Sequence, residues 1–140
     1  MGRLSLPDWA YELITTARAA RLGLIDGSGR PRVLPVTYAV VGDSVWSAID
    51  DKPKRVRGAE LARVHWLRER PDATLLVDRY SDDWDELAWV QLIGRAAVLD
   101  DAPAPAELIS RYPQYRDRPP AGPMVRLDVD RAVHWRAGAG

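Results

Sequence analysis

A short basic segment offers the clearest candidate for ligand-binding chemistry. Lysine occurs at only two positions, Lys52 and Lys54, and Arg55 and Arg57 follow closely. We expect residues 50–57 to form a loop between a strand and a helix, where the free N–H groups of the helix N-terminus also attract anions. Ammonium and guanidinium groups in that place would form a cradle for a phosphate. A solvated basic loop is the alternative interpretation.

The strands before this segment are suited to a flat ligand. Ser47 and Ala48 are small and would let a flat ring approach the backbone. In residues 32–38, Pro35 interrupts an apolar run, and proline removes one donor from the hydrogen-bonding ladder. We therefore expect an edge position, a bulge or a place where something other than a strand meets the backbone. An edge strand protected by proline, with no ligand, explains the same pattern.

Several other kinds of chemistry lack the residues they need. The absence of cysteine excludes disulfides, thiolate metal sites, iron–sulfur clusters and cysteine nucleophiles. His65 and His134 are the only histidines and lack metal-ligand spacing, so we expect no metal site. The chain also lacks the motifs of serine hydrolases, Rossmann dehydrogenases and P-loop enzymes. No catalytic residue can be assigned from these patterns.

Six tryptophans are present and phenylalanine is absent. Trp9 falls on the apolar face of a predicted helix and is assigned to the core. Trp84, Trp89 and Trp135 are candidates for ring stacking or for a dimer interface, where tryptophan is enriched. Core packing is the alternative for each of these three.

The composition bounds the class of protein. A chain of 140 residues with 46% apolar and 29% charged residues is typical of one soluble domain, here residues 1–140. No apolar run approaches the length of a membrane span, and the N-terminus lacks a signal-peptide pattern, so we expect a cytoplasmic protein. The formal net charge of zero argues against a nucleic-acid partner, although the first 70 residues carry about +4 and the rest about −4.

These residues must be positioned by helices and strands whose patterns are readable. Helical spacing of apolar residues predicts helices, and turn signals with alternating or continuous apolar runs predict strands. The predicted helices cover 6–17, 59–69 and 103–111, the predicted strands cover 22–25, 33–40, 44–49, 73–77, 87–99 and 125–135, and 112–123 is expected to be an irregular surface loop. Gly94 marks a bulge or bend in its strand.

Tight turns between successive strands require antiparallel pairing, which argues against a parallel, doubly wound nucleotide-binding fold. The expected fold is therefore mainly β, of the α+β type. It is a small antiparallel β-barrel of about six strands, decorated with two to three helices.

The order of these motifs resembles the pyridoxamine 5'-phosphate oxidase-like split β-barrel superfamily. The segments that carry the resemblance are 20–29, 32–36, 46–48, the lysine-rich loop, 70–73 and 89–96, so it covers nearly the whole chain. Residues 75–84 are most similar to the actinobacterial branch thought to use the deazaflavin coenzyme F420.

The resemblance implies a homodimer with two flavin or deazaflavin sites at the interface, each built from both subunits. It implies a ring along Leu34, Pro35, Val36 and Thr37 and the facing Trp46, Ser47 and Ala48, a phosphate at Lys52, Lys54 and Arg55, and contributions of Trp89 and Gln91 from the other subunit. Arg32 occupies the position of an arginine that precedes the ring-binding strand in the flavin oxidases. Arg57 and Arg63 would add positive charge for the phosphate and glutamate tail of F420, whereas FMN needs fewer cations.

The implied activity is hydride transfer between coenzyme F420 and a small or flat conjugated substrate. A hydride carrier does the chemistry itself, which explains why no acid, base or nucleophile stands out. Lys-Pro-Lys-Arg at 52–55 replaces the Ser-Arg-Lys phosphate motif of the oxidase, which argues against pyridoxamine phosphate as substrate. The alternatives are an FMN-dependent oxidoreductase of the same fold and a non-catalytic protein that binds a flavin or a tetrapyrrole.

Overall fold

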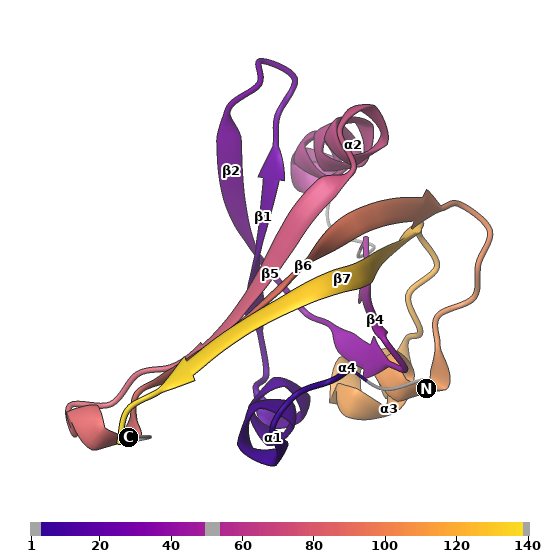
Figure 1. Ribbon diagram of the computed structural model, residues 1–140. Coiled ribbons are helices and arrows are strands. Elements are labelled where there is room, and N and C mark those ends of the chain that lie inside the picture. The colour runs from indigo at the N-terminus through magenta and orange to yellow at the C-terminus, as the bar shows by residue number, and fades with distance from the viewer. Residues whose placement is uncertain (1–3, 50–53, 139–140) are drawn as a thin grey trace.

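The computed structural model describes residues 4–49 and 54–138 (Figure 1). Over these two ranges it holds seven strands in a single antiparallel sheet, four α-helices and one short 3-10 helix. The expected fold class, mainly β within an α+β architecture, is confirmed. The strand and helix counts each exceed the prediction, for reasons given below.

The elements follow one another along the chain as hairpins separated by helices. In order they are α1 (Asp8–Thr16), β1 (Ala20–Ile25), β2 (Pro31–Val36), β3 (Ala39–Val41), β4 (Ser44–Ala48), α2 (Lys54–Glu69), β5 (Asp72–Arg79), η1 (Trp84–Glu86), β6 (Ala88–Leu99), α3 (Ala106–Arg111), α4 (Pro113–Asp117) and β7 (Met124–Arg136). Most of the predicted ends agree with the observed ends within about three residues.

The sheet must curl because of its strand order. That order is β2-β1-β5-β6-β7-β4-β3, so β2 and β3 lie at opposite edges. In a flat sheet, seven strands would separate the two edges by about 29 Å. Only Thr37 and Tyr38 join β2 to β3, and the chain from Val36 to Ala39 spans at most about 11 Å. The two edges therefore come together, which makes the sheet a barrel that is split between β2 and β3.

The single strand predicted over 33–40 is wrong, because the chain breaks into β2 and β3 at Thr37 and Tyr38. Tyr38 is fully buried, and its backbone N–H donates to the Tyr112 hydroxyl (3.1 Å). No turn signal stands at Thr37 and Tyr38 in the sequence, and this hydrogen bond comes from a residue more than 70 positions away. This break is what adds the seventh strand.

Helical structure also extends beyond its predicted bounds. Helix α2 begins at Lys54 rather than at 59, so Lys54, Arg55 and Arg57 lie in its first turns and not in a loop as predicted. Gly58 obscured this in the sequence because glycine disfavours a helix interior. The region 112–123 is not wholly irregular, since α4 occupies Pro113–Asp117 with proline at its first position, where its missing N–H costs nothing.

Two hydrophobic clusters support the barrel. The larger one fills the inner face of β1, β5 and β6 and includes Leu22, Leu75 and Leu92, with α1 packed on β5 and β6 and α2 on β1 and β6 (Figure 1). The smaller one joins β3, β4 and β7 to α3 and α4, and consists of Ala39, Ala48, Leu108, Tyr112, Tyr115 and Met124. In the described part of the chain, no helix is long and apolar enough to cross a membrane.

Two predictions about strand irregularities are confirmed. The pairing of β6 with β7 shifts register between Ile93 and Gly94, as expected of a bulge. A side chain at Gly94 would overlap the backbone oxygen of Asp128 on β7, so only glycine fits this approach. Pro35 lies on β2, an edge strand of the sheet, where a missing donor is tolerated.

Candidate functional site

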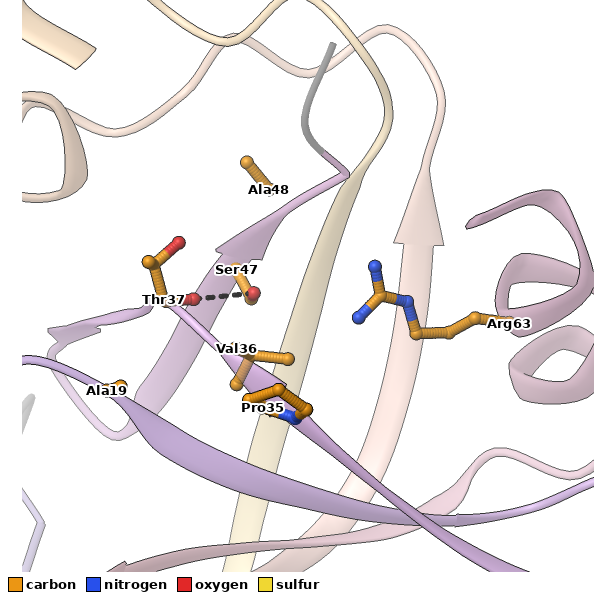
Figure 2. Close-up of a pocket in the computed structure, with 7 residues that line it drawn as sticks. All are labelled: Ala19, Pro35, Val36, Thr37, Ser47, Ala48 and Arg63. Carbon is orange, nitrogen blue, oxygen red and sulfur yellow. Dashed lines mark hydrogen bonds between the residues drawn. The ribbon is translucent and has the colours of Figure 1, made fainter. Parts of the chain in front are cut away.

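A cavity of about 160 Å³ opens where the two edges of the curled sheet meet (Figure 2). Its walls come from the end of β2, the connection to β3, the end of β4 and the middle of α2. The lining residues are Ala19, Pro35, Val36, Thr37, Ser47, Ala48 and Arg63. The fold thus brings together Pro35, Val36 and Thr37 from one predicted ring-binding segment with Ser47 and Ala48 from the other.

A hydrogen bond between the two walls holds the cavity in shape. The Ser47 hydroxyl donates to the backbone carbonyl of Thr37 at 2.6 Å, as the dashed line in Figure 2 shows. This bond ties β4 to the end of β2 although the two strands are not neighbours in the sheet. The Ser47 oxygen keeps lone pairs that can accept a hydrogen bond from a ligand N–H.

Arg63 supplies a buried positive charge to the cavity. Its residue is only 8% exposed, and its guanidinium extends from α2 toward the strands that carry Val36 and Ser47 (Figure 2). Arg63 precedes Leu67 by one helical turn, so both lie on the apolar face of α2. Arg63 therefore places a guanidinium group, which can donate hydrogen bonds to an anion, at this wall of the cavity.

Sequence reasoning assigned Arg63 only as one of several extra cations. The signal that singles it out is an arginine at a core-facing helical position, one turn before a buried leucine. Ala19 was missed, and a lone alanine before a strand carries no signal.

Three of the predicted ligand residues lie elsewhere. Leu34 packs against the larger hydrophobic cluster, and Trp46 packs against the smaller one. Arg32 stacks over the Trp66 ring, 4.9 Å from its centroid, and pairs with the Asp26 carboxylate at 3.5 Å. None of the three lines the cavity, so their roles toward a ligand stay predictions.

Trp89 and Gln91 lie on the outer face of the sheet. Their neighbours along β6, Ala88, Val90 and Leu92, are buried inside, and alternation along the strand turns Trp89 and Gln91 outward. Within one chain they therefore face away from the cavity. A site that contains all of these residues requires a second subunit.

The same outer face carries a broader groove of about 470 Å³. The small residues Gly23 and Thr74 form the bottom of this groove. Arg32, Val33 and Ile93 are among the other residues that line it. Gly23 and Thr74 are directly paired in the ladder between β1 and β5, the second and third strands from the β2 edge of the sheet.

The basic segment is described only in part. Lys52 lies outside the described residues, and Lys54 and Arg55 are placed by the backbone in the first turn of α2. Both therefore lie at the N-terminus of the helix that carries Arg63. Whether they hold a phosphate stays a prediction.

The remaining aromatic and histidine residues fall outside the cavity. Trp9 packs against the larger cluster, as predicted, and its ring meets that of His134 edge-on at 5.7 Å. Trp84 and Trp135 are exposed. Over the described ranges, no three or more His, Cys, Asp or Glu side chains gather closely enough to hold a metal ion.

Tyr38 anchors the wall that contains Thr37. Its hydroxyl donates to the backbone carbonyl of Ile14 at 2.6 Å, at the end of α1. Burial raises the pKa of Tyr38 to about 12, and the Arg111 guanidinium over its ring opposes part of that rise. The phenol therefore stays protonated and keeps this hydrogen bond at any ordinary pH.

Comparison with known proteins identifies the family. The sequence profile of the pyridoxamine 5'-phosphate oxidase family matches residues 6–136. The chain belongs to this family. No curated protein sequence matches it closely enough to count as a relative. Membership supports a flavin-type oxidoreductase function in general.

Solved structures of family-like proteins share the fold at low sequence identity. A conserved hypothetical protein of Mycobacterium tuberculosis, Rv2991, is 18% identical over 96% of this chain and 87% of its own, with a TM-score of 0.72. An FAD-binding protein of Mesorhizobium loti is 19% identical over 89% of this chain and 87% of its own, with a TM-score of 0.63. A heme-binding protein of Mycobacterium smegmatis is 18% identical over 98% of this chain and 57% of its own, with a TM-score of 0.67.

Proposed function

We propose that this member of the pyridoxamine 5'-phosphate oxidase family is an oxidoreductase that transfers a hydride between coenzyme F420 and a small or flat conjugated organic substrate. The observation that carries the proposal is the cavity itself. It joins two predicted ring-binding segments, around Val36 and Ser47, to the buried cation of Arg63. Apolar walls with one cation are what a flat anionic cofactor needs.

The residues present fit part of such a cofactor. Pro35, Val36 and Ala48 offer apolar surface to a ring face, Ser47 offers an acceptor, and Arg63 attracts an anion. The cavity of about 160 Å³ is smaller than the usual ligand pocket of about 300–1,000 Å³ and matches a space that admits a single benzene-sized ring. One chain thus supplies only part of a site for a three-ring cofactor.

A second copy of the chain would complete the site. Trp89 and Gln91 face outward on β6, where they are available to a partner subunit and not to their own cavity. We therefore propose a homodimer in which each cofactor lies between subunits, acting on a small-molecule substrate in the cytoplasm. Residues 1–140 form one domain in this proposal.

Each side chain has a specific task in the proposed reaction. Bound F420 supplies the hydride chemistry. Pro35, Val36 and Ala48 exclude water from one face of the ring, and Ser47 fixes the ring edge through its free lone pairs. Arg63 holds the anionic part of the cofactor at the α2 wall.

FMN on the same fold is the second candidate, and the structural neighbour named as an FAD-binding protein supports it. The neighbour named as a heme-binding protein raises tetrapyrrole binding as a further alternative. Iron ligation would need a histidine, and neither His65 nor His134 lines the cavity. The flavin-type alternative is therefore the stronger of the two.

A side-by-side titration tests the proposal. Purified protein is titrated with F420 and with FMN, and the fluorescence of each cofactor reports binding. We expect tighter binding of F420, because the deazaflavin carries more negative charge for Arg63 and its neighbours. Tight binding of FMN with none of F420 would overturn the choice of cofactor. Oxidation of reduced F420 at a rate that depends on an added acceptor would establish an enzyme, and the lack of any acceptor in a broad screen would favour a storage role.

A further inference from the structure

The two short helices α3 and α4 do not line the cavity, but their tyrosines hold its wall. Tyr112 and Tyr115 are both buried, and their rings meet edge-on at 5.4 Å. The Tyr115 hydroxyl lies 2.8 Å from the hydroxyl of Thr37, which does line the cavity. A residue of α4 thus contacts the polar group of the cavity wall directly.

Tyr112 holds the backbone of Tyr38, the residue that follows Thr37 in the wall. Its hydroxyl accepts from the N–H of Tyr38 at 3.1 Å and lies within hydrogen-bond distance of two backbone carbonyls, those of Tyr38 (3.1 Å) and Arg18 (3.0 Å). The Nε of Arg111 also donates to it, at 3.3 Å. A phenol has one proton and two lone pairs, so this hydroxyl uses its full hydrogen-bonding capacity at the break between β2 and β3.

Arg111 secures the tyrosines to the first helix. Its guanidinium lies over the Tyr38 ring, 4.9 Å from the centroid, and donates to the backbone carbonyls of Thr15 and Ala17 at the end of α1. Thr37 and Tyr38 are therefore held between α1 on one side and the α3–α4 segment on the other. These contacts on both sides fix the backbone of Thr37 and Tyr38. The part of Thr37 that can still rotate is its side chain, and the orientation of its hydroxyl depends on its partner, Tyr115.

The chemistry of the pair sets the direction of their hydrogen bond. A phenol is a much stronger acid than an alkyl alcohol, with an ordinary pKa near 10, and the stronger acid is the better donor. The 2.8 Å contact itself allows either hydroxyl to donate, and the acidity argument assigns Tyr115 as the donor and Thr37 as the acceptor. With that assignment, the proton of the Thr37 hydroxyl is left to be donated elsewhere. The cavity that Thr37 lines is the space where a ligand acceptor would lie.

We propose that Tyr115 is a positioning residue that makes Thr37 a hydrogen-bond donor to a ring carbonyl oxygen of the bound cofactor. The inference rests on the proposed function, since flavins and deazaflavins both carry carbonyl oxygens on their pyrimidine ring. Tyr115 itself does not touch the cofactor in this arrangement. By orienting Thr37, Tyr115 favours cofactors and substrates that place a hydrogen-bond acceptor at the Thr37 hydroxyl, and it disfavours ligands that place a hydrogen-bond donor there.

Two measurements test the proposal separately. Three-bond scalar couplings of Thr37 are recorded by NMR without cofactor, and binding of F420 and FMN is titrated, for the wild type, Tyr115→Phe, Thr37→Val and the double variant. We expect one Thr37 side-chain rotamer in the wild type and averaging over several in Tyr115→Phe. We expect cofactor affinity to fall about threefold to tenfold in each single variant, with little further loss in the double variant.

The controls separate positioning from general stability. Tyr80→Phe removes the hydroxyl of an exposed tyrosine and should change neither measurement. Thr37→Ser keeps the hydroxyl and should retain most of the affinity that Thr37→Val loses. If Tyr115→Phe does not fold, the contrast between Thr37→Ser and Thr37→Val still decides whether the hydroxyl acts on the ligand.

Three results would overturn the proposal. One is a single unchanged Thr37 rotamer in Tyr115→Phe, another is equal affinity of Thr37→Val and the wild type, and the third is fully additive losses in the double variant. If the wild type bound neither cofactor, the proposed function would fail, and the NMR couplings would still decide whether Tyr115 positions Thr37.

Discussion

Replacing Arg63 with methionine should weaken cofactor binding while the protein stays folded. Arg63 is 8% exposed and faces the cavity from the apolar side of α2, beside Val64 and one turn before Leu67. Methionine keeps an unbranched stem for that packing and avoids the cost of burying a charge. Arg63 also makes contacts of its own within the chain. We therefore expect the free energy of unfolding to fall, but by no more than about 3 kcal/mol.

The loss in binding follows from the charge of the lost contact. A hydrogen bond that involves a charged group contributes about 1.5–3 kcal/mol, which corresponds to a loss of about tenfold to 150-fold in affinity. The assay is a fluorescence titration with F420, run beside urea unfolding of the unliganded protein. Arg68→Met is the matched control, because Arg68 lies on the same helix, is half-exposed and pairs with Asp100 at 2.6 Å.

The control should bind F420 as the wild type does and lose less than about 1 kcal/mol of stability, as exposed ion pairs usually do. An affinity of Arg63→Met within twofold of the wild type would refute the role of Arg63 at the cofactor. A loss of stability above about 3 kcal/mol in the same variant would show that Arg63 acts as a structural residue instead.

Three further predictions concern the frame of the site. Gly94→Ala should destabilise the protein by about 3 kcal/mol or more in urea unfolding, because its Cβ would overlap a backbone oxygen of β7, whereas Gly23→Ala, which meets only an ordinary contact at 3.6 Å, should cost about 1 kcal/mol or less. Tyr38→Phe should cost about 1–3 kcal/mol at neutral pH. Because burial raises the folded pKa of Tyr38 to about 12, its contribution is complete below pH 10 and is lost as pH rises through 12, so the variant should show a shallower alkaline loss of stability. The backbone N–H of Arg30 lowers the pKa of Asp26, burial opposes this lowering, and the backbone N–H of Ser28 adds to it. Asp26→Asn should therefore be less stable than the wild type at pH 7. On acidification below about pH 4 the variant should lose less stability than the wild type, because it has no carboxylate to protonate.

Most of the fold could be predicted because its signals are local. The turn at 26–29 and the apolar face of α1 each follow from neighbouring residues, and so does the antiparallel arrangement. The break at Thr37 and Tyr38 could not be predicted, because it depends on bonds to Tyr112 and Tyr115, which lie in the α3–α4 segment far along the chain. The local pattern contains no turn signal at these two residues.

The residues of the site that follow a local strand pattern could be predicted, whereas the roles of those that depend on packing or on a partner subunit could not. Val36 and Ser47 were singled out by strand pattern and by the resemblance, and the curl of the sheet brings them to one cavity. Arg63 was underrated because arginine is ordinarily an exposed residue, and only packing shows that its helical face is buried. Trp89 and Gln91 face away from the cavity of their own chain, so their role depends on a partner that a single sequence does not contain.

A crystal structure of the protein with F420 tests the central claim most directly, because it locates the cofactor. The account predicts the ring against Pro35, Val36 and Ser47, with an anionic group of the cofactor within hydrogen-bond distance of the Arg63 guanidinium. A cofactor bound in the outer groove beside Gly23 and Thr74, with the cavity vacant, would contradict it.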